Sequence, residues 1–228
     1  GNSYTYYNDL PNMVKQIALS FGDTLNYEAS TPGGSTLQMH STNNQTLSKI
    51  SQQEWDNVVI QCQSQEPSFS PTQVSNDVYP YAQILIDSIE SNSLCTEPMF
   101  FMTWGRKYGD QQNCQFYPPI CTYSGMQQRL RQSYLQMAFD HNASCAPVGM
   151  AWKESINQNP NLELYSPDQS HPSLEGSYLA ACTFYSSLFK KLSIGSSYIP
   201  NGIDTSTASF LQNIASNRVL DSISTWNI

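Results

Sequence analysis

The chain has 228 residues, and 39% of them are hydrophobic. At roughly 150 residues per domain, this length and composition predict one large domain with a sizeable core rather than a disordered chain. The formal net charge is −8, so the basic surface that phosphate backbones require is absent and nucleic acid is not an expected partner. No apolar run approaches the ~18 residues that a membrane span needs. Charged residues make up only 12% of the chain, and this polar but weakly charged composition favours a secreted or periplasmic protein.

Helical and strand patterns alternate along the chain. The expected elements, in order, are a helix at 9–21, strands at 26–30 and 58–61, a helix at 78–91, a strand at 99–103, a helix at 125–142, a strand at 147–151, a helix at 172–192 and a helical run at 207–216. Such alternation predicts a parallel sheet covered on both faces by helices. We expect one domain over residues 1–228, with a Ser/Thr/Asn-rich C-terminal extension from about residue 193. The pattern leaves the oligomeric state open.

The six cysteines show no CxxC pair and no Cys/His spacing typical of structural zinc. Cys114 and Cys121 bracket a short Pro-rich loop, which makes a disulfide plausible. Cys95 and Cys145 each precede a predicted strand. If those strands are parallel neighbours, the two Cα atoms could meet the ~4.4–6.8 Å that a disulfide requires. Cys62 and Cys182 lie in apolar segments, and we expect them to be buried thiols. His40 and His141 have no carboxylate partner nearby in the sequence, and we expect both at the surface.

Four short segments fall at predicted strand ends or directly before helices, where a parallel sheet gathers functional groups: residues 1–5, 33–36, 61–67 and 166–172. The last segment carries Asp168 and His171 three residues apart, with Pro167 and Pro172 limiting its freedom. A serine nucleophile needs a base to take its proton, and the base needs a carboxylate to fix its tautomer. Ser3, at the turn before the first helix, would direct its own N–H outward. The pattern indicates acyl transfer.

The same segments resemble, in order, the conserved blocks of the SGNH (GDSL-like) hydrolases. The first block, Gly1-Asn2-Ser3-Tyr4-Thr5, is closest to the branch of uncharacterised, DUF4886-like members, with Asn in place of the usual Asp. Gly34-Ser35-Thr36 resembles the second block, and Asp168-Gln169-Ser170-His171-Pro172 matches the Asp-x-x-His-Pro block fully. The resemblance extends from residue 1 to about residue 192. It implies a three-layer α/β/α sandwich with a parallel sheet of about five strands in flavodoxin-like order.

The resemblance also implies a role for each site residue. Ser3 would be the nucleophile, His171 the general base and then acid, and Asp168 the orienting carboxylate. The N–H groups of Ser3 and Gly34, together with the side-chain amide of Gln65, would form the oxyanion hole. No metal ion or organic cofactor is needed for this chemistry.

The third block departs from the usual pattern, which supplies an Asn to the oxyanion hole. Here the segment reads Gln61-Cys62-Gln63-Ser64-Gln65. It resembles the Gln-Gly-Glu-Ser-Asn version found in sugar O-acetylesterases of the superfamily, and this likeness places Gln65 where the Asn sits. Gln63 is the alternative donor.

The start of the chain departs as well. Members of the superfamily have an apolar central strand immediately before the nucleophile block, whereas only Gly1 and Asn2 precede Ser3 here. Our hypothesis is that the chain begins inside its own fold and lacks this first strand, so that a neighbouring chain or an altered packing fills the slot.

The expected function is ester hydrolysis through an acyl-enzyme, acting on a small-molecule or glycan ester. The third-block likeness and the aromatic loop favour an acetyl group on carbohydrate. Trp104 and the Tyr-rich loop 108–123 could form a platform for sugar stacking or ordinary hydrophobic cover, and of the two we favour cover. The alternatives are a carbohydrate-binding protein that kept the fold and lost turnover, or a lipase or thioesterase of the same superfamily.

Overall fold

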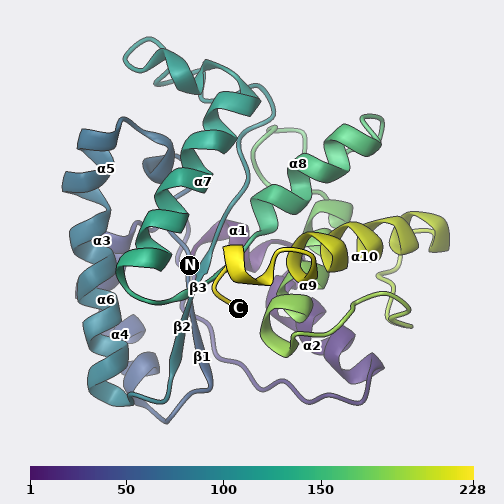
Figure 1. Ribbon diagram of the computed structural model, residues 1–228, viewed down its shortest axis with the longest axis horizontal. Coiled ribbons are helices and arrows are strands. Elements are labelled where there is room, and N and C mark those ends of the chain that lie inside the picture. Colours follow the sequence, from purple (N-terminus) through teal and green to yellow (C-terminus); the bar gives the residue numbers. More distant parts are fainter.

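The computed structural model describes residues 1–228 and shows a parallel sheet between two layers of helices (Figure 1). The sheet contains β1 (Asn57–Ile60), β2 (Glu97–Phe101) and β3 (Ser144–Ala146), with β2 in the middle. Both pairings are parallel, with Val59 opposite Met99 and Phe100 opposite Cys145. The α/β/α class predicted from the sequence is therefore confirmed.

The helices divide between the two faces of the sheet. One layer holds α3 (Leu37–Thr42), α4 (Asn44–Ser51), α5 (Pro71–Asp77), α6 (Tyr79–Asn92) and α7 (Tyr123–Asp140). The other holds α2 (Leu10–Ser20), α8 (Val148–Gln158), α9 (Leu174–Phe189) and α10 (Thr205–Leu220). Successive side chains of β2 enter opposite cores: Phe100 packs with the first layer and Phe101 with the second. Because both faces of the sheet are covered, the buried part of β2, from Met99 to Phe101, is apolar at every position instead of alternating. No helix has the length and apolarity needed to cross a membrane.

Short helical turns complete the chain. They are α1 (Ser3–Tyr6) and the 3₁₀ turns at Tyr7–Asp9, Glu66–Ser68, Pro118–Cys121 and Ile223–Thr225. The helix predicted at 9–21 is α2, with Asp9 at its N-cap position and Pro11 in its first turn. The Asp9 side chain makes no capping hydrogen bond, because Asp9 adopts a left-handed backbone conformation with φ of 54°. The C-terminal residues 205–220 form α10, which packs in the same core as α9.

The strand predictions need two corrections. The sheet has three strands instead of about five, since residues 26–30 form no ladder and no strand precedes Ser3. The strand predicted at 147–151 is wrong, because β3 ends at Ala146 and α8 begins at Val148. A short apolar run fits a buried strand and the buried face of a helix equally well. The extra signal here is Gly149: a Cβ at this position would lie 2.1 Å from the Thr103 carbonyl oxygen, so the helix start packs directly on the chain that follows β2.

The cysteines divide into one confirmed pair and four free thiols. Cys114 and Cys121 form the expected disulfide. Cys95 and Cys145 are not bonded, and this prediction is wrong because the strands have a different register. Cys145 lies inside β3 and opposite Phe100, whereas Cys95 lies in the turn ahead of β2, so the two cysteines are at different levels along the sheet. Cys62 and Cys182 are buried thiols, as predicted.

Candidate active site

Ser3, His171 and Asp168 meet beyond the carboxyl end of the sheet in one hydrogen-bonded chain. The Oγ atom of Ser3 lies 2.8 Å from Nε2 of His171, and Nδ1 of His171 contacts Oδ2 of Asp168. A carboxylate can only accept, so Nδ1 carries the proton and Nε2 is left to accept the Ser3 hydroxyl proton. Chemically, an arrangement of this kind is able to activate a serine hydroxyl and to fix the tautomer of the imidazole beside it.

The carboxylate of Asp168 is held by its own loop. Its Oδ1 atom accepts hydrogen bonds from the backbone N–H groups of Ser170, at 3.1 Å, and His171, at 2.9 Å. Partial burial raises the pKa of the Asp168 carboxyl, but the bonds from His171 and from these N–H groups outweigh it and hold the pKa below the usual value. Asp168 is therefore ionised at neutral pH.

The loop that carries Asp168 and His171 is fastened on several sides. Ser170 is bound through its hydroxyl to Tyr4 Oη, at 2.6 Å, and through its carbonyl oxygen to Trp104 Nε1, at 3.0 Å. The backbone N–H of Lys107 donates to the Gln169 carbonyl oxygen at 3.0 Å. The loop is thereby tied to the chain that follows β2.

Two buried amides hold the turn that carries Ser3. Asn2 accepts a hydrogen bond from the Tyr4 N–H at 3.1 Å through its side-chain oxygen, which caps α1. Gln61, the first residue after β1, accepts from the Asn2 N–H at 2.8 Å and donates to Asn2 Oδ1 at 3.0 Å. Sequence reasoning gave Gln61 no role. The sequence feature that could have pointed to Gln61 is its position as a polar residue at the carboxyl end of a predicted buried strand.

Asn2 also connects the turn that carries Ser3 to the Gly34-Ser35-Thr36 segment. Its Nδ2 donates to the Ser35 carbonyl oxygen at 3.1 Å. The Asp that is usual here could not donate this bond. Next to Ser35, Gly34 has a φ of 71°, a conformation that side chains with a Cβ rarely adopt. The Gly34 N–H donates no backbone hydrogen bond, and the Ser3 N–H lies at the start of α1, where no preceding turn supplies an acceptor.

In the third block, the side-chain amides that were expected to face the oxyanion are already hydrogen-bonded within the protein. Gln65 is buried, and its Nε2 donates to Asp110 Oδ2 at 2.9 Å and to Gln112 Oε1 at 3.3 Å, so both of its amide protons have acceptors. Gln63 bonds locally: its Oε1 accepts from the Gln65 N–H at 2.6 Å, and its Nε2 donates to Gln65 Oε1 at 3.2 Å. The second proton of the Gln63 amide has no acceptor in the protein.

Aromatic rings pack around the imidazole. The ring of Tyr7 stacks on His171 with a centroid distance of 4.3 Å, and Tyr4 meets it edge-on at 5.5 Å. Trp104 is fully buried between Tyr4 and Trp152, so it is core and no sugar platform. The contact from Tyr7 was not predicted, because nothing in the sequence distinguishes it from its neighbour Tyr6.

His40 was predicted at the surface and is buried, which corrects that expectation. It lies in α3, just after Gly34, with Nδ1 at 2.9 Å from Thr46 Oγ1 and Nε2 at 2.7 Å from the Gly1 carbonyl oxygen. Burial, with a contribution from the nearby Gly1 amine, lowers the pKa of the imidazole to about 4. No cluster of three or more His, Cys, Asp or Glu side chains could hold a metal ion.

No known family profile and no curated protein sequence matches the chain. Solved structures do match. A DUF4886 family protein from Bacteroides uniformis superposes with a TM-score of 0.76 at 18% identity, covering 96% of this chain and 92% of that one. A provisional SGNH hydrolase from Slackia heliotrinireducens superposes with a TM-score of 0.65 at 25% identity, over 82% and 94% of the two chains.

An acetylxylan esterase from Geobacillus stearothermophilus is also similar, with a TM-score of 0.55 at 15% identity, covering 82% of this chain and 81% of that one. These likenesses show that the chain has the fold of the SGNH hydrolases, and the resemblance drawn from the sequence blocks is confirmed at that level.

Proposed function

We propose that the chain is a serine ester hydrolase that works through an acyl-enzyme. The observation that carries the proposal is the hydrogen-bonded chain from Asp168 through His171 to the Ser3 hydroxyl, with Nε2 of His171 at 2.8 Å from Oγ. A serine is activated in this way when a base lies within hydrogen-bond reach and is itself oriented by a third group.

In the acylation step, Ser3 Oγ attacks the ester carbonyl carbon while Nε2 of His171 takes the hydroxyl proton. The carbonyl electron pair moves onto the oxygen and makes a tetrahedral oxyanion. When this intermediate collapses, the bond to the leaving oxygen breaks and His171 gives its proton to the alcohol. Asp168 stabilises the imidazolium throughout and stays ionised.

In deacylation, water replaces the alcohol. His171 takes a proton from the water as its oxygen attacks the acyl carbon, and the proton then returns to Ser3 Oγ when the acid leaves. The oxyanion of each step would be bound by the N–H groups of Ser3 and Gly34. A side-chain amide from Gln65 or Gln63 would complete the hole. For Gln65 this requires giving up a bond to Gln112 or Asp110, whereas Gln63 has a free amide proton.

For the substrate, we propose a small acyl ester, with acetyl on carbohydrate as the class to test first. Two observations support this choice: the likeness of the 61–65 segment to sugar O-acetylesterases, and the acetylxylan esterase among the structural neighbours. The bonding of Gln65 to Asp110 favours one second candidate, an SGNH-fold protein that binds glycan esters with little turnover.

We further propose a secreted or periplasmic location. The Cys114–Cys121 disulfide supports it, because such bonds persist mainly in oxidising compartments.

The experiment is labelling with a fluorophosphonate, followed by mass spectrometry of the modified peptide. We expect one adduct, on Ser3, which Ser3→Ala abolishes and which the exposed control Ser91→Ala leaves unchanged. With acetylated sugars as substrate, Ser3→Ala should lose at least about 10⁴-fold in kcat. Labelling without hydrolysis of any ester would favour the binding protein. No labelling of Ser3 in the folded chain would overturn the hydrolase.

A further inference from the structure

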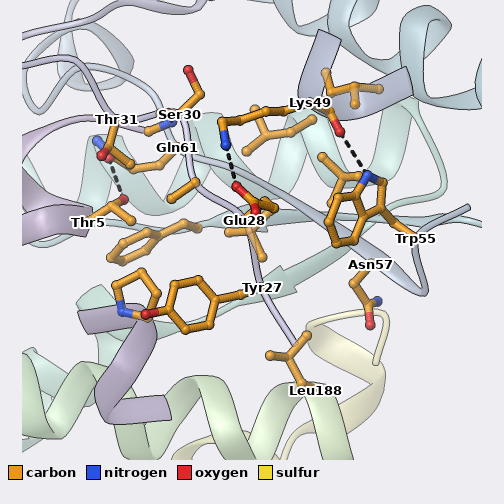
Figure 2. A pocket seen from close by; sticks show the side chains of 18 of the residues that line it. Thr5, Tyr27, Glu28, Ser30, Thr31, Lys49, Trp55, Asn57, Gln61 and Leu188 are labelled. Carbon is orange, nitrogen blue, oxygen red and sulfur yellow. Dashed lines mark hydrogen bonds and ion pairs between the residues drawn. The ribbon is translucent and has the colours of Figure 1, made fainter. Parts of the chain in front are cut away.

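Three cationic side chains lie next to a cavity or next to the candidate site, and they differ in what binds them. The largest cavity, of about 580 Å³, has one lysine and no arginine in its walls, and this lysine, Lys49, is paired with Glu28 (Figure 2). A smaller cavity of about 220 Å³ is lined by Lys107, which is paired with Glu163. The third cation, Arg106, has no carboxylate within hydrogen-bond distance.

The guanidinium of Arg106 uses few of its donors within the protein. Arginine offers more N–H donors than any other side chain. Nη1 donates to Gln112 Oε1 at 3.3 Å, which is a long bond to a neutral amide. Nη2 makes no hydrogen bond within the protein, and Nε is buried without a partner. The side chain is 22% exposed, so the guanidinium reaches solvent with most of its donors free.

The nearby carboxylate of Asp110 does not occupy this guanidinium, because its oxygens are bonded elsewhere. Asp110 is fully buried, and its Oδ1 atom lies 3.8 Å from Nη1 of Arg106. Oδ1 accepts from the backbone N–H groups of Gln112, at 3.2 Å, and Asn113, at 3.3 Å. Oδ2 accepts from Asn113 Nδ2 at 2.8 Å and from Gln65 Nε2 at 2.9 Å. Neutral donors therefore satisfy Asp110, and Arg106 keeps its donors for another acceptor.

Arg106 lies beside the loop 166–172. The backbone N–H of Lys107, the next residue, donates to the Gln169 carbonyl oxygen at 3.0 Å. Burial raises the pKa of the Tyr4 phenol, and the positive charge of Arg106 is one of the influences that oppose this shift, so the guanidinium lies close enough to Tyr4 to act on it. The free donors of Arg106 are therefore at the candidate site, between this loop and the third block.

The part of an ester that would lie on this side is the alcohol. In the proposed mechanism His171 gives its proton to the leaving oxygen, so the alcohol must lie within hydrogen-bond reach of the imidazole and beside its loop. Arg106 borders the same loop. Hydrogen bonds from a guanidinium to a carboxylate are charge-assisted and about twice as strong as bonds between neutral groups, such as a sugar hydroxyl and an amide. A carboxylate on the alcohol is thus the acceptor that matches these free donors best.

We propose that Arg106 is a specificity-determining residue, which selects esters whose alcohol part carries a carboxylate, as an acetylated uronic acid does. The inference rests on the proposed function and narrows its substrate class from glycan esters in general to acidic glycan esters. Nη2 of Arg106 binds the carboxylate while the acetyl group lies at Ser3. The protein has a net charge of −8 and repels an anion at long range, so the preference comes from this local pair.

The first test measures kcat/KM for two acetylated methyl glycosides, one of glucuronic acid and one of glucose, in which a CH₂OH group replaces the carboxylate. We expect the acid to be preferred by at least about tenfold, mainly through KM, because a bond to a charged group is lost in the neutral sugar. Arg106→Gln should abolish this preference and leave the neutral sugar within about twofold, which also shows that the variant folds. Lys190→Gln removes one charge at the far end of α9 and should change neither value. Equal use of the two sugars by the unaltered chain, or a preference that survives Arg106→Gln, would overturn the proposal.

A binding measurement separates this inference from the hydrolase itself. The Kd of each sugar is measured by calorimetry on Ser3→Ala, which cannot form an acyl-enzyme. We expect the acid to bind at least about tenfold more tightly, and Arg106→Gln in the same background to remove the difference. An acid preference in Kd without hydrolysis of either sugar by the unaltered chain would overturn the hydrolase and keep the role of Arg106. Hydrolysis of both sugars with equal Kd values would keep the hydrolase and overturn the role of Arg106.

Two further comparisons test the position and the chemistry of the contact. A hemisuccinate ester of the neutral sugar has its carboxylate on the acyl side, and we expect no gain over the acetyl ester. A gain that Arg106→Gln removes would contradict the assignment to the alcohol. Arg106→Lys keeps the charge without the planar fork, so it should recover part of the acid preference. Acid preference as low in Arg106→Lys as in Arg106→Gln would contradict recognition by charge.

Discussion

The two sides of the candidate site differ in how many hydrogen bonds hold them: the loop that carries His171 has more than the turn that carries Gly34. On the His171 side, the loop 166–172 is tied by backbone bonds and by the bonds from Tyr4 and Trp104 to Ser170. On the Gly34 side, the segment 24–31 has one main-chain hydrogen bond, from the Gly1 amine to the Ser30 carbonyl oxygen. The Gly34 turn is tied mainly through Asn2 to the Ser35 carbonyl oxygen. In the proposed hydrolase, His171 and Asp168 would therefore be preorganised, while the Gly34 side would depend on a few buried side-chain bonds.

The largest effect should come from the rigid side. Asp168→Asn keeps an oxygen for the Ser170 and His171 N–H groups, so the loop should fold, but the amide no longer requires a proton on Nδ1 of His171. We expect kcat to fall about 10³- to 10⁴-fold with KM little changed, measured with an acetyl ester. Asp221→Asn, an exposed Asp on the far helix end, serves as the control. A loss below about tenfold would show that Asp168 does not set the tautomer.

The flexible side is tested through its main tie. Asn2→Asp removes the donor to the Ser35 carbonyl oxygen and sets a buried carboxylate against it. We expect a loss of about tenfold to a hundredfold in kcat as Gly34 moves, and about 1–3 kcal/mol in unfolding free energy from urea titration. Asn26→Asp makes the same chemical change on the same side without contacting Ser35. Unchanged activity in Asn2→Asp would mean that Gly34 is positioned by other contacts.

The flexible side should also be the more acid-sensitive. The His40 imidazole is neutral in the fold with a pKa of about 4, whereas the unfolded chain binds its proton near pH 6.5. The unfolded state thus binds more protons between these values, and stability falls as the pH drops from 6.5 to 4, by about 3 kcal/mol. Urea midpoints at pH 7 and pH 4 should show this extra loss in the unaltered chain and not in His40→Gln. Parallel pH profiles for the two proteins would contradict it.

The smallest effect concerns the ring that stacks on the base. Tyr7→Leu should lower kcat by about twofold to tenfold, in line with the worth of an aromatic pair, and leave KM unchanged because Tyr7 acts on the imidazole orientation. Tyr7→Phe should restore the rate, since the stack needs the ring and not the hydroxyl. Tyr6→Leu, at the exposed neighbour, is the matched control. Equal losses in Tyr7→Phe and Tyr7→Leu would assign the role to the hydroxyl instead.

The parts of the site that could be predicted from the sequence are those encoded locally. Asp168 and His171 lie three residues apart on one loop, so their pairing needs no knowledge of the distant chain. β1 and β2 were found because short runs of Val, Ile, Met and Phe between polar residues are typical of buried strands. The Cys114–Cys121 disulfide could be predicted because the two cysteines bracket one short loop.

Interactions set by register and tertiary packing could not be predicted. The Cys95–Cys145 pairing failed on the register of β2 against β3. His40 appeared to be an ordinary polar position because Thr46 and Gly1, which surround it, meet it only in the folded chain. The Gln65 amide is taken up by Asp110, a residue 45 positions away in a loop without a regular pattern. In each case the prediction failed because the position depends on a contact that forms only in the folded chain.

The stacked indoles of Trp104 and Trp152 have an optical consequence. Their ring centroids are 4.1 Å apart with planes 6° from parallel. Two chromophores this close couple their excited states, and the pair gives a circular dichroism signal wherever the in-plane directions of the two transitions differ. Trp104 also donates to the Ser170 carbonyl oxygen beside His171, so a displaced 166–172 loop should change the surroundings of this indole pair. The indole pair thus links the packing of the core to the loop that carries His171, and near-ultraviolet circular dichroism is the measurement that would follow both without substrate or label.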